Sequence, residues 1–156
     1  MQNTGEIVVF LVLGAAIAAG LFLLARWAKK SATVFAAYAL IAVAFLYVGF
    51  AFRSDNPNAW AAVEMTGVAL FGSLALLSIY WSPWFVVAGF AAHPLWAIYF
   101  HYVGAGSDFT PAPIALATAG FDGAMALGTA FFLWSRRATP SSPTQSASNT
   151  QRGRAR

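Results

Sequence analysis

The 156-residue sequence has no cysteine and few charged residues. The absence of cysteine excludes disulfide bonds and metal sites built on thiolates, and it leaves the redox environment of the protein undetermined. Charged residues make up 9% of the chain, whereas soluble domains carry about 25%. This scarcity of charge argues against a soluble globular domain.

Hydrophobic residues make up 60% of the chain, and they occur in several long runs. About 20 consecutive apolar residues suffice for a helix to cross a bilayer. We therefore predict an all-α, polytopic membrane bundle of five transmembrane helices in the cell membrane, formed by residues 1–137. The spans are expected at about 7–27, 32–52, 59–80, 83–103 and 113–134.

The basic residues are unevenly distributed around these spans, which indicates an orientation. Only Arg53 falls on one side, and the others follow the first or the fifth span: Arg26, Lys29, Lys30, Arg136, Arg137, Arg152, Arg154 and Arg156. Because basic loops stay in the cytoplasm, we expect an external N-terminus and a cytoplasmic C-terminus. The same asymmetry accounts for the net charge of +4 without nucleic acid as a partner.

Residues 138–156 differ in composition from the rest of the chain. They are rich in Ser, Thr, Pro and Gln, with almost no apolar residues. Such a segment buries too little surface to offset its ordering entropy, so we expect a disordered, basic cytoplasmic tail. Its arginines are suited to contact anionic lipid headgroups.

Four ionisable side chains fall inside or at the end of predicted spans: Glu64, His93, His101 and Asp122. Groups of this kind are costly in hydrocarbon and usually face a bundle interior. At 1.5 Å per residue, His101 lies about 3 Å from the external end of its span and Glu64 about 7 Å. Asp122 and His93 lie about 14 and 15 Å deep on the same scale.

These depths predict a ladder of polar groups that opens to the external side. His93 and Asp122 are expected to pair at the midplane, while His101 and Glu64 form the wet outer part. The alternative is that each group bonds separately to backbone or water, with His101 as an ordinary residue at the interface.

The last span carries polar residues on one side and small residues on the other. Thr118 and Thr129 fall close to the face of Asp122, which makes that face polar. On the other side Gly120, Ala124 and Gly128 form a stripe of small residues, which lets helices pack closely in membranes.

Two histidines and two carboxylates have the donor chemistry of a zinc or iron site. The spacing argues against it, since His93 and His101 are about 12 Å apart along a helix axis. Ala97, halfway between them, cannot bind a metal. We therefore predict no cofactor, and a metal site of Glu64, His93, His101 and Asp122 is kept only as the weaker alternative.

The segment AAHPLWAIYFH, followed by a loop and AGFDGAMALG, resembles a group of small bacterial integral membrane proteins of unknown function. One helix of that group carries a pattern like HPLWD-x-x-HH, and the next contains Phe-Asp. The matching positions are 93–96 and His101, then Phe121 and Asp122. The chain departs from the pattern at Ala97, where the group has Asp. The resemblance implies a location in the membrane, and it does not imply any particular activity.

From these residues we expect a polar cluster that binds or translocates a small solute or protons. One alternative is a membrane-embedded enzyme that uses the cluster as a metal or acid/base site. The other is a structural or assembly subunit in which the polar groups only hold helices together. The sequence specifies neither the solute nor the oligomeric state.

Overall fold

The computed structural model describes residues 3–27 and 31–137, and the regular elements of these residues are helices. They are α1 (Thr4–Trp27), α2 (Ala32–Ala51), α3 (Pro57–Tyr80), α4 (Trp84–Trp96) and α5 (Ala112–Arg137). A π-helical segment (Ala97–Tyr102) continues α4, and a short 3-10 helix (Ala105–Asp108) precedes α5. The predicted all-α class is confirmed. The predicted tail at 138–156 lies outside the described residues.

Local signals in the sequence account for several helix ends. At the start of α1, the Asn3 Oδ1 accepts a bond from the Glu6 N–H at 2.8 Å, and the Asn3 N–H donates to Glu6 Oε2 at 3.1 Å. This reciprocal pair is a capping box. Asn56 caps α3 by accepting from the Ala59 N–H. Pro57 then takes the first helical position, where its missing N–H has no cost.

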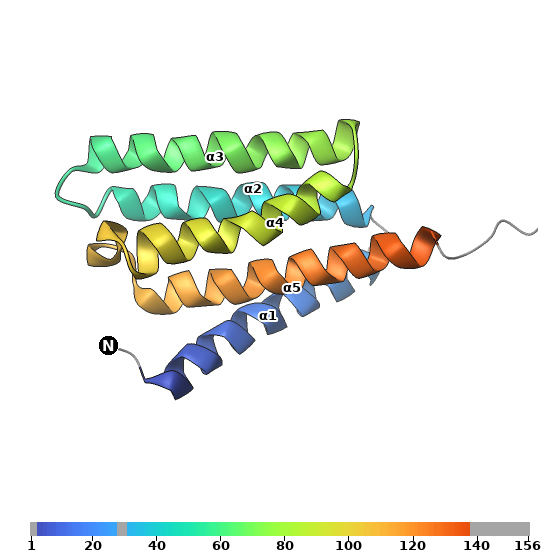
Figure 1. Cartoon of the computed structure of the whole chain (residues 1–156), viewed down its shortest axis with the longest axis horizontal. Helices are drawn as coiled ribbons and strands as arrows, with labels where there is room; N and C mark the ends of the chain where they lie inside the picture. Colours follow the sequence, from blue (N-terminus) through green and yellow to red (C-terminus); the bar gives the residue numbers. More distant parts are fainter. Residues whose placement is uncertain (1–2, 28–30, 138–156) are drawn as a thin grey trace, which may run out of the picture.

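Helices α2 to α5 run antiparallel to their chain neighbours and form a bundle, and α1 crosses the outside of α5 at an angle (Figure 1). The loop between α2 and α3 and the 3-10 helix lie at one end, at the left of Figure 1. We call this the Asn56 end. The turn between α3 and α4 and the last turn of α5 lie at the opposite end, which we call the Trp81 end.

Helix α1 packs mainly against α5, and glycines bring the two backbones together. A Cβ atom on Gly14 would lie 1.8 Å from the carbonyl oxygen of Ala117, and one on Gly120 would lie 2.1 Å from that of Leu11. The ring of Phe22 covers Gly128 in the same way. The small-residue stripe predicted on the last span is therefore a helix-packing surface, as expected.

Four helices, α1, α2, α3 and α5, are long and apolar enough to cross a membrane. Large apolar side chains also cover the outside of the bundle, among them Val9, Leu23, Leu70, Leu95 and Phe131. A water-soluble monomer rarely exposes so much contiguous apolar surface. The chain is thus a membrane protein by the character of both its helices and its surface.

The predicted fourth span, 83–103, is helical over Trp84–Tyr102, but only its first part is α-helical. The α-helical part ends at Trp96, and the next residues form π-helical turns. Pro94 lies inside α4 and has no N–H to donate to the preceding turn. Within the π-helical segment, the Val103 N–H reaches back five residues to the Ile98 carbonyl at 3.0 Å. Helix α4 alone is too short for a span.

The apolar core fills the bundle between α2, α3, α4 and α5. Its larger members are Leu40, Phe71, Val86, Phe90 and Met125, and buried alanines of α2 and α3 surround them. Phe90 lies one helical turn from His93, and Met125 lies one turn from Asp122, both toward the Trp81 end. The polar groups therefore sit between this core and the Asn56 end.

Candidate functional site: a buried histidine and carboxylate cluster

His93 and Asp122 form a direct pair at the centre of the bundle. His93 Nδ1 lies 2.6 Å from Asp122 Oδ2, and both side chains are fully buried. The pairing predicted from helix depth is confirmed. Each group lowers the cost of burying the other, because the N–H of the imidazole donates to the carboxylate or the two share a proton.

His101 and Glu64 form a second pair nearer the Asn56 end. His101 Nε2 lies 3.3 Å from Glu64 Oε1. The other ring nitrogen, Nδ1, is 3.2 Å from the Thr110 hydroxyl. If Thr110 donates to Nδ1, the imidazole proton resides on Nε2 and faces the carboxylate. The ring of His101 therefore lies between the Thr110 hydroxyl and the Glu64 carboxylate.

Tyr47 of α2 lies between the two pairs. Its ring stacks on His101, with 4.0 Å between centroids and 11° between planes, and its centroid is 5.9 Å from that of His93. The hydroxyl of Tyr47 bonds to the Thr118 hydroxyl on α5. Thr118 in turn donates to backbone carbonyls of its own helix. Tyr47 therefore connects the outer pair to the helix that carries Asp122.

The outer pair is covered at the Asn56 end, contrary to the expectation of a wet outer part. Glu64 is 1% exposed and His101 is fully buried. The rings of Trp60 and Phe109 lie 6.4 and 6.2 Å from the His101 ring, and a Cβ on Gly106 would lie 2.7 Å from its Nδ1. The interpretation of His101 as an exposed interfacial residue is wrong, because the 3-10 helix and the residues after it fold over the ring.

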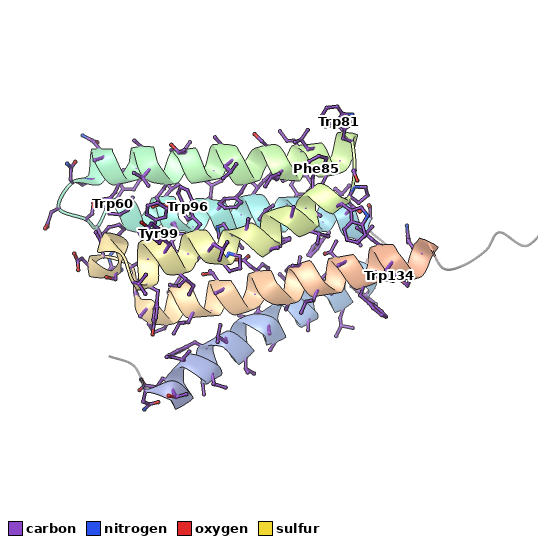
Figure 2. The ribbon with its side chains drawn as sticks, viewed as in Figure 1. Trp60, Trp81, Phe85, Trp96, Tyr99 and Trp134 are labelled. Atoms are coloured by element: carbon purple, nitrogen blue, oxygen red, sulfur yellow. The ribbon has the colours of Figure 1, made fainter. Side chains whose placement is uncertain are left out.

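Trp96 closes the side of the cluster between α3 and α4. Its indole N–H donates to Glu64 Oε2 at 3.3 Å, and its ring lies against Gly67, where a Cβ would be 2.9 Å away. Figure 2 shows Trp96 and Trp60 near the Asn56 end of α3, with Trp81 and Trp134 toward the opposite end. Phe71 completes this wall, since its ring meets His93 edge-on at 4.6 Å.

The cluster keeps unused hydrogen-bonding capacity. Within residues 3–27 and 31–137, the buried side-chain atoms without a hydrogen-bond partner are Glu64 Oε1, His93 Nε2, His101 Nε2, Asp122 Oδ1 and Thr129 Oγ1. The same residues contain no group of three His, Cys, Asp or Glu side chains placed to hold one metal ion. The four ionisable residues are arranged as two imidazole–carboxylate pairs, which suits proton exchange better than shared coordination of a metal.

The sequence analysis identified the four ionisable residues and missed Tyr47, Thr110 and the role of Trp96. Tyr47 is close to the end of its span, where tyrosine is usually an interfacial anchor. Its position on the buried side of α2, with Leu40 and Ala44, is the signal that sets it apart. Thr110 lies in a loop and carries no such signal.

Comparison with known proteins does not assign a family or a function to this cluster. No protein-family model, curated protein or solved structure matches the chain.

Proposed function

We propose that the protein crosses the cell membrane five times, with α4 and the π-helical segment together as the fourth crossing. At the rise of an α-helix, the chain from Trp84 to Tyr102 would span at most about 27 Å, a little less than the hydrocarbon thickness of about 30 Å. Trp27, Trp81 and Trp134 are all strongly exposed, and each lies at the end of a helix that runs toward the Trp81 end (Figure 1). An aromatic belt with flanking basic residues supports a cytoplasmic Trp81 end and an external N-terminus.

We propose that the buried cluster takes up and releases protons, or a small solute that carries them. The observation behind this proposal is the pair of imidazole–carboxylate contacts, at 2.6 and 3.3 Å, with the Tyr47 ring between them. Histidine is the side chain whose charge changes most readily near neutral pH, and an adjacent carboxylate compensates that charge. Two such pairs in series form two proton-binding sites.

The surroundings support exchange with the Asn56 end. The outer pair is separated from that surface by Trp60, Phe109 and the 3-10 helix. Toward the Trp81 end the interior is apolar, and the buried polar side chains of the described residues there are Ser78 and Thr129. Proton binding therefore requires only a small movement of the covering loop, whereas translocation also requires the apolar half to open.

Nuclear magnetic resonance of the two histidines tests this proposal. The chain has two histidines, so ¹⁵N-histidine labelling in lipid bilayers gives two imidazoles, which His93→Gln and His101→Gln variants assign. We expect at least one imidazole to change protonation reversibly as the pH changes. Asp122→Asn should alter the titration of His93 more than that of His101, and Glu64→Gln should do the reverse.

Two results would overturn the proposal. If both imidazoles keep one protonation state over the whole pH range, the pairs only hold helices together. If alanine at Glu64, His93, His101 or Asp122 changes thermal stability and leaves the remaining titration unchanged, the same structural role follows.

One observation favours the enzyme alternative, in which the cluster acts as an acid and base on a lipid-soluble substrate. An apolar groove of about 510 Å³ lies outside the cluster, and Phe71 and Trp96 line it. These two rings are also the wall of the cluster. The Trp96→Ala variant removes the ring that separates the groove from the cluster, so the two would become one space. Under the enzyme alternative this variant changes turnover of a lipid-soluble substrate, whereas under the proton-binding proposal it changes only the titration of His101.

A further inference from the structure

A second groove lies far from the polar cluster, between α1 and α5 at the Trp81 end. Its volume is about 820 Å³, within the range of small-molecule sites. Small and aromatic residues form its walls, including Ala19 and Phe22 of α1 and Ala124, Gly128 and Phe131 of α5. The mouth of the groove is polar, because Ser135 and Arg136 line it there.

The side chain of Arg136 is positioned at this mouth. Its guanidinium carbon lies 4.4 Å from the centroid of the Phe132 ring, and Phe132 also lines the groove. Stacking on an aromatic ring fixes the guanidinium and leaves its N–H donors available for an anion. The ion pairs within residues 3–27 and 31–137 are those of His93 and His101, so no carboxylate of this part of the chain neutralises Arg136.

Arg136 is the charged residue that lines the groove, and no acidic residue of the described part of the chain lines it. Glu6, Asp55 and Asp108 belong to the Asn56 end, and Glu64 and Asp122 belong to the buried cluster. These are the five acidic residues of the whole sequence. Arg26 belongs to the last turn of α1, and Lys29 and Lys30 come soon after it in the sequence. An apolar groove with a cationic mouth is complementary to an anionic amphiphile.

The length of the groove matches one leaflet of a bilayer. From Ala124 to Arg136 the axis of α5 rises about 18 Å, and half of the hydrocarbon core measures about 15 Å. An acyl chain placed in the groove beside Ala124 and Phe131 would therefore bring its phosphate to the level of Arg136. Trp134, which is strongly exposed, marks the same interfacial depth.

We propose that this groove is a binding site for an anionic phospholipid of the surrounding bilayer, with an acyl chain between α1 and α5 and the phosphate on Arg136. The site is separate from the histidine cluster and does not depend on proton binding there. It also differs from diffuse attraction between lipid headgroups and the basic tail, because the groove selects an acyl chain as well as a charge.

Native mass spectrometry of the purified protein with added phosphatidylglycerol or phosphatidylcholine of equal acyl length tests the site. Arg136→Gln should weaken phosphatidylglycerol binding by roughly fivefold or more and leave phosphatidylcholine unchanged. Arg53→Gln is the matched control, because Arg53 also rests over an aromatic ring, Phe50, at the opposite end. It should leave the binding of both lipids unchanged.

Ala19→Phe fills the groove from an exposed position of α1 and should reduce binding of both lipids. If Arg136→Gln and Arg53→Gln weaken phosphatidylglycerol binding equally, the proposal is overturned, since the lipid is then attracted unspecifically to a cationic surface. Unchanged binding in both Arg136→Gln and Ala19→Phe would also overturn it. A stable dimer without bound lipid, broken by Ala19→Phe, would assign the groove to a second copy of the chain instead.

Discussion

Tyr47 contributes two separable interactions to the cluster at the scale of the single residue. Its ring stacks on the imidazole of His101, and its hydroxyl bonds to Thr118 on a different helix. The ring and the hydroxyl therefore have different partners, and a substitution that removes only the hydroxyl separates them.

We expect Tyr47→Phe to lower the free energy of unfolding by about 1 kcal/mol, because one buried hydrogen bond is lost while ring packing remains. Tyr38→Phe on the same helix is the control, since Tyr38 is exposed and should tolerate the change. Unfolding in mixed micelles of mild and denaturing detergent measures both. If Tyr38→Phe lowers the free energy of unfolding as much as Tyr47→Phe does, the role assigned to the buried hydroxyl is contradicted.

The contact between His93 and Asp122 predicts energetic coupling. In a double-mutant cycle of His93→Ala and Asp122→Ala, the coupling free energy should be roughly 0.5 kcal/mol or more. The reason is that either single change leaves a buried polar group without its partner at 2.6 Å. Unfolding free energies of the wild type, the two single variants and the double variant give the coupling. Strict additivity would show that the contact contributes nothing to stability.

The positions of individual side chains could be predicted from the sequence where they depend on helix geometry alone. The rise per residue places His93 and Asp122 at the same depth, and the short connection between their helices makes them neighbours. The burial of His101 depends instead on how the loop at 105–110 folds over the ring. Tertiary contacts of this kind leave no periodic pattern in the sequence, which is why the exposure of His101 was predicted wrongly.

At the scale of the helix, the association of α1 with α5 depends on glycines at points of backbone contact. Gly14 meets Ala117, and Gly120 meets Leu11. Interhelical attraction in lipid comes from close packing, since lipid tails are as apolar as leucine side chains. A single methyl group at such a point forces the helices apart.

Gly120→Ala should therefore lower the free energy of unfolding by about 1–3 kcal/mol through overpacking. Gly123→Ala on the same helix is the matched control, because a Cβ there meets nothing within 4 Å. It should be neutral or slightly stabilising, since alanine favours helix more than glycine does. Thermal unfolding in detergent compares the two variants, and equal effects would refute the packing role of Gly120.

The boundaries of the helices were largely predictable from the sequence, but the π-helical segment was not. Apolar runs and the prolines at 57, 83 and 113 locate the helices to within a few residues. Pro94 indicates a disturbance in the fourth span. It does not by itself indicate whether the chain responds with a kink or with π-helical turns.

At the scale of the whole molecule, the orientation in the membrane is open to direct measurement. The protein has no cysteine, so a single introduced cysteine labels one position. Under the proposed topology, Asn56→Cys and Asp108→Cys should react with a membrane-impermeant thiol reagent from outside intact cells. Lys29→Cys should react only after the membrane is permeabilised. External labelling at position 29 would overturn the five-span arrangement.

The pairing of α1 with α5 has a consequence for the order of synthesis. Of the helices α1 to α5, α1 leaves the ribosome before the others, yet its main partner α5 is made after them. Asp122, on the same last helix, also completes the central pair. Long separation along the chain delays native contacts, and exposed partial structures are prone to misassembly. A nascent chain that stalls after α4 therefore holds two unfinished surfaces, the glycine face of α1 and the imidazole of His93, and a single insertion event completes both.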